Sequence, residues 1–327
     1  MIIGLASAVG CGGDDHDGLA LQPSDAGAEA GLDAAAPHLD AAPGIEPPPC
    51  SGELPVMRAR DLQTYEYLDP DWSCYDEPNA QPDGGLTSRS VTFRMTEFPF
   101  IVEGVTVDFF FGASTLGMAA VTRVVEPDAG AVTFDAPAMA TTLCARVHAR
   151  PNAGNPAFSI LETHEYGLSI PIDGAPIQGA TFVRDTRAIT VSHVLDGVEE
   201  DPDKALLVAN ISDCGGRPVT GARFELIDDE TSLPVPTGSE PRATRASYMY
   251  FAIPNASCTF TTNDQQTSTW VMANAPINVA GGSRTATYRL RASGRMRETD
   301  SEPVVIDEWE VELFAGGTTM VGSRTAR

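Results

Sequence analysis

Lysine is almost absent from this sequence, and basic residues as a whole are few. Lys204 is the one lysine in 327 residues, and 21 basic residues stand against 45 acidic ones, which leaves a net charge of -24. Nucleic-acid binding needs Lys and Arg clustered against phosphates, so the composition argues against a nucleic-acid partner. The same deficit disfavours sustained contact of the protein surface with anionic lipid headgroups.

Sequence motifs that mark common enzymes are also absent. The chain has no Gly-x-Ser-x-Gly elbow, no Walker loop, no dinucleotide-binding glycine fingerprint and no His-Glu-x-x-His. No two cysteines have the C-x-x-C spacing typical of zinc and thiol-redox sites. We therefore expect the protein not to be an enzyme and to need no metal or cofactor.

Two groups of residues still offer reactive or metal-binding chemistry. Glu162, His164 and Glu165 form a compact His–carboxylate group, and on a strand Glu162 and His164 would share a face. An acid–base or metal role is one interpretation of this group, and a solvated loop or strand edge is the favoured one. The acidic run 196–203 has oxygens for calcium but lacks an EF-hand ligand pattern, which favours a charged linker.

The first eleven residues predict export. The apolar run 1–10 is too short to span a bilayer and reads as the end of a secretory signal peptide. Ala8-Val9-Gly10-Cys11 resembles a bacterial lipobox, which implies that Cys11 is the lipidated N-terminus of a palmitate-bearing lipoprotein. The alternative is a chance cysteine after a short apolar start.

The segment that follows predicts a disordered tether. Residues 12–49 are rich in Asp, Ala, Pro and Gly, and no Lys or Arg occurs from residue 1 to 57. Such a composition buries too little apolar area to offset the entropy lost on ordering the chain. Lipid, tether and folded body together are typical of a cell-envelope lipoprotein. Because glycines rather than Asp follow Cys11, we expect the outer membrane and possible surface exposure, with the leaflet open.

Five cysteines remain for disulfides if Cys11 carries lipid, and an exported chain permits such bridges. Nearest-neighbour pairing predicts Cys50 with Cys74 and Cys214 with Cys258. This pairing leaves Cys144 as a thiol.

Alternating apolar and polar residues predict an all-β fold. Val91, Phe93 and Met95 alternate with polar residues, as a half-buried strand requires. Further strands are expected at 105–111, 143–147, 205–212, 222–226, 285–291 and 308–313. Within the second of these runs, Phe110 breaks the alternation, which predicts a strand end covered on both faces. Short strands with turns at this spacing indicate two tandem β-sandwich modules, transthyretin-like or Ig-like, after the tether.

The domain boundaries follow from these patterns. The predicted units are the signal with its lipidation cysteine at 1–11, the tether at 12–49, a Cys/Trp connector at 50–85, the first sandwich at 86–172, a linker with a possible short helix at 173–204, and the second sandwich at 205–327. Trp72 in the connector is expected to pack onto the first sandwich. Tyr248, Tyr250 and Phe251 are candidates for stacking on a sugar ring, although core packing is the favoured interpretation.

One turn carries a resemblance to a known family. The run from Ile211 to Ala222 resembles the opening of carboxypeptidase-regulatory-like, or transthyretin-like, modules, with their strand, "D-x-x-G-x-P-V-x-G-A" turn and second strand. The run from Asn274 to Gly282 looks like their late turn. The resemblance implies a seven-stranded sandwich that serves as a scaffold or binding unit without catalytic residues. The whole layout looks like uncharacterised lipoproteins of myxobacteria.

Taken together, these patterns predict a non-catalytic cell-surface lipoprotein whose sandwiches serve binding, adhesion or envelope structure. The expected partners are the membrane, through the N-terminal lipid, and a polysaccharide or protein. The alternative is an accessory carbohydrate- or peptide-binding domain of an unrecognised hydrolase.

Overall fold

The computed structural model describes residues 52–73, 87–96, 104–125, 130–171, 174–180, 198–250, 253–255, 258–262, 269–277 and 284–322, except 62, 65, 112–114, 116, 157 and 158. These residues form 18 strands, and the fold is all-β as predicted. No helix in this part of the chain is long and apolar enough to cross a bilayer. The predicted signal, Cys11 and the tether lie outside the described residues, as does the possible helix at 185–197.

The strands group into three parts of the molecule. An N-terminal segment holds β1 (Arg58–Arg60) and β2 (Tyr67–Leu68). The first module holds β3 (Ser88–Thr96), β4 (Thr106–Phe110), β5 (Val121–Val124), β6 (Ala131–Pro137), β7 (Thr142–Val147), β8 (Thr163–Ser169) and β9 (Ile177–Ala180). The second holds β10 (Ala205–Asn210), β11 (Val219–Thr220), β12 (Ala222–Asp228), β13 (Arg245–Tyr250), β14 (Ile253–Asn255), β15 (Thr269–Ala275), β16 (Thr285–Gly294), β17 (Val304–Phe314) and β18 (Thr318–Val321).

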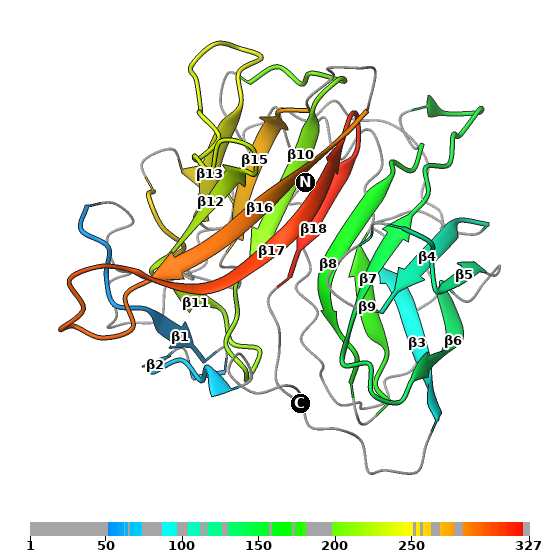
Figure 1. Cartoon of the computed structure of the whole chain (residues 1–327), viewed down its shortest axis with the longest axis horizontal. Coiled ribbons are helices and arrows are strands. Elements are labelled where there is room, and N and C mark those ends of the chain that lie inside the picture. Colours follow the sequence, from blue (N-terminus) through cyan, green and yellow to red (C-terminus); the bar gives the residue numbers. More distant parts are fainter. Residues whose placement is uncertain are drawn as a thin grey trace, which may run out of the picture.

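One sheet of nine strands runs through both modules (Figure 1), in the order β14-β13-β15-β10-β18-β8-β7-β4-β5. The last strand, β18, lies parallel to β10 on one side and parallel to β8 on the other. The two sandwiches therefore meet edge to edge through hydrogen-bonded backbone rather than through a flexible linker.

The first module is a sandwich of β8-β7-β4-β5 against the three-stranded sheet β6-β3-β9. Its core contains the alternating residues expected from the sequence, including Val91, Phe93 and Met95, which are all buried. Phe109 stacks on Phe134 across the two sheets, with ring centroids 4.1 Å apart.

The second module packs β14-β13-β15-β10-β18 against the three-stranded sheet β12-β16-β17. All seven residues of β15 are buried, because Trp270 and Met272 face the sandwich core while Val271 and Ala273 face a second apolar cluster. Strands covered on both faces read as continuous apolar runs, which explains the unbroken apolar stretch of β10.

The break in alternation at Phe110 has the predicted cause. Phe109 lies in the core of the first module, whereas Phe110 is buried in the cluster that continues into the second. The end of β4 is thus covered on both faces, because the second module packs beside it.

The predicted connector is part of the second module. Residues 52–73, named here the N-terminal clasp, pair β1 with β11, and Met57 is buried in the second module's core. Trp72 packs against this cluster rather than onto the first module as expected. Trp72 lies there because the carbonyl of its neighbour Asp71 accepts a hydrogen bond from the backbone N–H of Cys214 in the second module.

These contacts also move the predicted boundaries. The first module extends past residue 172, because β9 pairs with β3 inside the stretch predicted as a linker. The second module consists of the clasp and residues 198–322, so the first module is an insertion between them.

Candidate functional site

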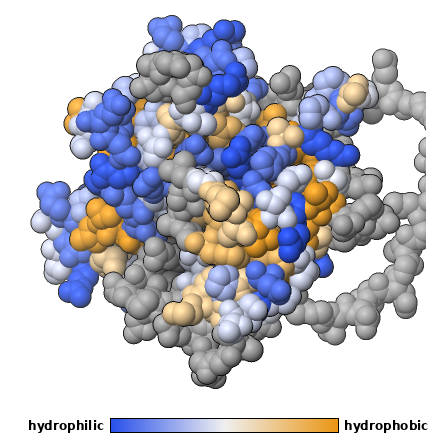
Figure 2. All heavy atoms as spheres, turned by 45° about the vertical axis from the view of Figure 1, so that its right-hand side comes forward, coloured by the Kyte–Doolittle hydropathy of each residue, from blue (hydrophilic) through white to orange (hydrophobic). Residues whose placement is uncertain are grey.

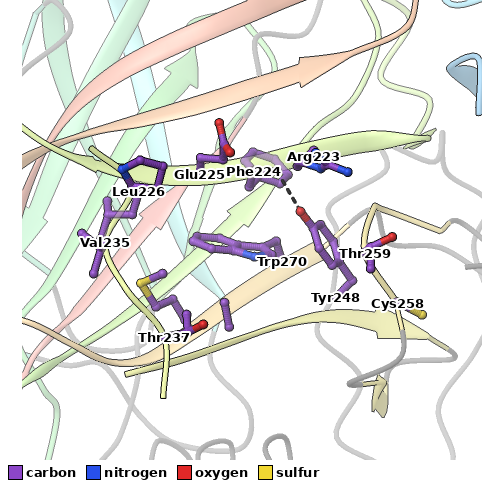
Figure 3. Close-up of a pocket in the computed structure, with 13 residues that line it drawn as sticks. Arg223, Phe224, Glu225, Leu226, Val235, Thr237, Tyr248, Cys258, Thr259 and Trp270 are labelled. Atoms are coloured by element: carbon purple, nitrogen blue, oxygen red, sulfur yellow. Dashed lines mark hydrogen bonds between the residues drawn. The ribbon is translucent and has the colours of Figure 1, made fainter. Parts of the chain in front are cut away.

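A pocket opens in the second module between β12 and the strands β13 and β15 (Figure 3). Its volume is about 220 Å³. Trp270 forms its floor and stacks on Phe224, with ring centroids 5.8 Å apart and the planes at 23°. Arg223 and Glu225, which alternate with Phe224 along β12, supply charge at the pocket. Trp270 and Phe224 are both buried members of the sandwich core, so the aromatic floor is covered and the accessible lining is mostly polar.

Tyr248 is the predicted aromatic residue that reaches this pocket. Its side chain is buried, and its hydroxyl accepts a hydrogen bond of 2.9 Å from the backbone N–H of Phe224. Burial raises the pKa of Tyr248 above its usual value. The side chain of Tyr250, and Phe251 as a whole, lie outside the described residues. Tyr248 therefore packs in the core of the second module and also lines the pocket.

The outer edge of β12 is closed to an added strand. Ala222 exchanges hydrogen bonds with Thr261, donating to its hydroxyl and accepting from its backbone N–H. Farther along, the carbonyl of Leu226 accepts from the backbone N–H of Val235 at 2.7 Å. An edge whose outward groups are already bonded resists pairing with another chain.

The size of the pocket sets a further limit. Sites for drug-sized ligands are usually about 300–1,000 Å³, whereas this pocket has about 220 Å³. The pocket is therefore smaller than a site for a drug-sized ligand. Trp270, its main aromatic surface, was not among the candidates from sequence, because a tryptophan in an alternating strand looks like core.

The predicted His–carboxylate group lies at the joint between the modules. His164 on β8 is buried, and its Nε2 is 3.4 Å from an oxygen of Glu162. Arg146 on the neighbouring β7 pairs with the same carboxylate at 2.7 Å. The hydrogen bond with His164, followed by the Arg146 charge, holds the pKa of Glu162 below its usual value. From the second module, Glu312 brings an oxygen to 3.6 Å from Nδ1 of His164.

A chain of hydroxyl groups continues from the other side of the imidazole. The Thr115 hydroxyl lies 3.1 Å from Nδ1 of His164 and 2.6 Å from the hydroxyl of Tyr166. The Tyr166 hydroxyl accepts a hydrogen bond of 2.9 Å from the backbone N–H of Glu312 on β17. Tyr166 thus accepts a hydrogen bond from the edge strand β17 of the sheet β12-β16-β17, and Tyr248 accepts one from the opposite edge strand, β12. This network links the modules through side chains in addition to the shared sheet.

A hydroxyl, an imidazole and a carboxylate in sequence are the groups that nucleophilic catalysis uses. Here Thr115 is 2% exposed and His164 is 1% exposed, so the hydroxyl has no solvent face for a substrate to approach. Glu165, the third predicted member, is the next residue along β8 and points to the other face of the sheet. The structure brings Glu162 and His164 together, adds Glu312 and Thr115, and leaves Glu165 outside the group.

No group of three His, Cys, Asp or Glu side chains in that part of the chain has the arrangement needed to hold an ion. In the acidic run, Glu199 pairs with Arg242 at 3.4 Å, and the Asp201 N–H donates to the side-chain oxygen of Asn274 at 2.9 Å. These contacts fit the interpretation of a charged linker held against the second module.

The cysteines fall in different surroundings. Cys144 carries a buried thiol at the joint, and burial raises its pKa to about 12. Cys214 and Cys258 are buried in the second module. Cys11, Cys50 and Cys74 lie outside the described residues.

Apolar side chains also reach the surface. Figure 2 shows a wide apolar area on the side of the molecule that carries the first module, next to hydrophilic areas. Met118, Val124 and Met139 of that module are all more than half exposed. Large exposed apolar areas often mark an interaction site.

Comparisons with known proteins place this chain in no family. No family model matches it, and no curated protein matches it. Among solved structures, the Bacillus anthracis TIE protein is similar at 9% sequence identity and a TM-score of 0.22. That match covers 74% of this chain and 35% of the TIE protein chain. At such a TM-score the likeness carries no argument about fold or function.

Proposed function

We propose that this chain is a non-catalytic lipoprotein of the cell envelope, anchored through a lipid on Cys11, whose β-sandwich body serves binding, adhesion or envelope structure. One observation carries the proposal most directly. The two sandwiches share a nine-stranded sheet. The clasp, which follows the predicted tether, pairs its strand β1 with β11 of the second sandwich. Such a body suits a tethered role, because a force on the tether reaches both modules through hydrogen-bonded strands.

Export and lipidation are tested at the N-terminus of the native protein. Mass spectrometry of the membrane fraction is expected to find a diacylated Cys11 as the first residue. A Cys11→Ser variant is the matched control and is expected to lose membrane retention while keeping its fold. An N-terminus without lipid, in a chain recovered from the cytoplasm, would overturn the proposed location.

The ligand is proposed to be a polysaccharide or a protein. Supporting observations are the apolar surface of the first module and the Trp270 pocket. A glycan array and a pull-down from envelope extracts test this, and two empty results would leave envelope structure as the role. Binding at the pocket is expected to change Trp270 fluorescence, and Trp270→Phe is expected to remove that response. Binding that survives Trp270→Phe would move the site to another surface.

The alternative remains an accessory carbohydrate- or peptide-binding domain of a hydrolase. The small pocket beside β12, with Arg223 and Glu225 at it, is the observation that favours this alternative. The resemblance to carboxypeptidase-regulatory-like modules is compatible with both roles, because such modules act as scaffolds or binding units. Fusion to or co-purification with a hydrolase would favour the alternative over a freestanding lipoprotein.

A further inference from the structure

The sheet β12-β16-β17 has two outer edges, which differ in how their backbone groups are bonded (Figure 1). At the β12 edge, Thr261 bonds Ala222 and Val235 bonds Leu226. At the opposite edge, β17 pairs with β16 on one side, and no described strand lies on its other side. Within the described part of the chain, the sheet therefore has one closed edge and one open edge.

The last part of β17 is covered at the joint between the modules. The N–H of Glu312 donates to the Tyr166 hydroxyl at 2.9 Å, and the carbonyl of Glu312 accepts from the Thr319 hydroxyl at 2.8 Å. The backbone groups of Glu312 therefore point away from β16. Because the backbone groups of successive residues in an antiparallel strand alternate between its two sides, those of Glu310 and Glu308 also point away from β16.

These outward groups of β17 differ from those at the closed edge. Among the described residues, none bonds the backbone N–H or carbonyl of Glu310. The N–H of Glu308 donates to the carboxylate of its own neighbour Asp307 at 2.8 Å. A local side-chain bond of this kind competes with bonds to another strand and can be exchanged for one. Unpaired edge groups such as those of Glu310 are a template for pairing with another chain.

The side chains along this edge are apolar first and acidic farther on. Val304 is 43% exposed and Val305 is 56% exposed. The register with β16 pairs Val305 with Ser293, Glu308 with Arg291, and Glu310 with Arg289. Residues two apart along β16 share a face, so Val305, Glu308 and Glu310 lie on the same face of the sheet.

The arginines on this face are already paired, and Glu310 is not. Arg291 and Arg289 both pair with Glu308, at 2.9 and 3.4 Å. Arg289 also pairs with Asp229 on the side of β12. No base among the described residues forms an ion pair with Glu310. The carboxylate of Glu310 therefore remains available to a base on the outer side of β17.

We propose that the open edge of β17, from Val304 to Glu310, binds an extended segment of a partner protein as an added strand of this sheet. The segment carries an apolar side chain opposite Val305 and a Lys or Arg side chain opposite Glu310. In such strand addition, backbone hydrogen bonds supply affinity and side-chain pairs supply specificity. The proposal rests on the binding role in the proposed function, and it names the surface and the class of partner.

A second copy of this chain fits the edge less well than a basic segment does. Pairing two β17 edges brings the carboxylates of Glu308 and Glu310 from both copies to one seam. Like charges that lie opposite each other across strands are destabilising. Each chain also has a net charge of -24, which opposes self-association. The partner is therefore a different protein with basic residues in an extended segment.

Hydrogen exchange of the free full-length protein tests whether the edge is open. The amide of Glu310 is expected to exchange at least about tenfold faster than the amide of Val235, which is bonded at the closed edge. Slow exchange at Glu310 in a monomer would mean that another segment of this chain covers the edge. Slow exchange in a dimer, identified by light scattering, would mean that a second copy covers it. Either result overturns the proposal.

Peptide probes test strand addition itself. The first probe repeats Val-Lys four times, and its control has proline in place of the two central valines, which keeps the charge and removes ladder N–H groups. The first probe is expected to slow exchange at Glu310 and to bind at least about tenfold more tightly than the control. A peptide that repeats Val-Glu is expected not to bind. Equal binding of the two lysine peptides would show only attraction to an acidic protein and would overturn the proposal.

Variants of Glu310 locate the site. Glu310→Pro removes an N–H that faces away from β16, which an edge strand tolerates, and is expected to weaken Val-Lys peptide binding about tenfold. Glu310→Gln keeps the N–H and is expected to weaken binding about two- to fivefold through the lost charge pair. Glu230→Gln, in the loop after β12, removes the same charge elsewhere and is expected to leave binding unchanged. Glu310→Gln decides the matter if the proline variant does not fold, and affinity equal to that of Glu230→Gln would overturn the site.

The outcomes keep this inference distinct from the proposed function. Peptide binding at Glu310 in a protein whose envelope pull-down stays empty supports the open edge and overturns the binding role. A protein partner that still binds Glu310→Pro and Glu310→Gln with unchanged affinity supports the binding role and overturns the open edge as its site.

Discussion

The close packing between the two modules predicts that a side chain at Gly167 destabilises the protein. This residue lies on β8 with a φ of +73°, and a Cβ added to it would stand 2.4 Å from the carbonyl oxygen of Gly322 just after β18. Gly167→Ala therefore meets two costs. The left-handed backbone costs roughly 1–2 kcal/mol for a residue with a Cβ. Displacing the packed strand costs about 1–3 kcal/mol more.

Gly174→Ala is the matched control. Gly174 has a φ of +78° and nothing within 4 Å of an added Cβ, so only the backbone cost applies. We expect Gly167→Ala to lose about 1–3 kcal/mol more unfolding free energy in urea than Gly174→Ala, which is the steric part alone. Equal losses, within about 0.5 kcal/mol, would refute the close approach of the two strands.

The assay can also show whether the joint couples the modules. Trp72, Trp270 and Trp309, the three tryptophans of the chain, pack in the cluster centred on the second module. Tryptophan fluorescence therefore follows that module, while circular dichroism follows both. We expect coincident urea transitions in the unaltered protein and separate ones in Gly167→Ala. Separate transitions in the unaltered protein would mean that the shared sheet does not make the modules one cooperative unit.

Three further results are expected from the titratable groups and hydroxyls of the described residues. Tyr166→Phe and Tyr248→Phe each remove the acceptor of a backbone N–H, which should lower the free energy of unfolding in urea by about 1–3 kcal/mol. Only Tyr166→Phe should separate the fluorescence transition from the circular dichroism transition, because Tyr166 bonds across the two modules. The pKa of Glu162 is lowered, so its ionised carboxylate stabilises the folded state above pH 4.5, and this stabilisation is lost as the pH falls through the folded-state pKa. Glu162→Gln should therefore flatten the acid side of a curve of unfolding free energy against pH. An unchanged slope would contradict the pairing of Glu162 with His164. Since burial raises the pKa of Cys144 to about 12, iodoacetamide at pH 8 should label it only after unfolding, and rapid labelling of the native protein would show that the joint is open.

The strands and their faces were readable from the sequence because they depend on local alternation. Val91, Phe93 and Met95 point into a core, and Ala222, Phe224 and Leu226 do the same in the second module, as the period of two predicts. The break in alternation at Phe110 was also visible, because two consecutive apolar residues at the end of a strand imply that both of its faces are covered. The lipobox, the tether and the family resemblance remain predictions from the residues alone.

The pairing of distant segments was decided by the tertiary structure. No local pattern in the clasp indicates that β1 pairs with β11, about 160 positions later in the chain. Likewise, β18 has an ordinary strand pattern, and its place between β10 and β8 depends on which edges the folded modules leave available. The same holds for Glu312, which joins Glu162 and His164 only because β17 crosses the joint. Alternation fixes which face of a strand is buried, but the choice of neighbour depends on backbone hydrogen bonds that any sequence can form.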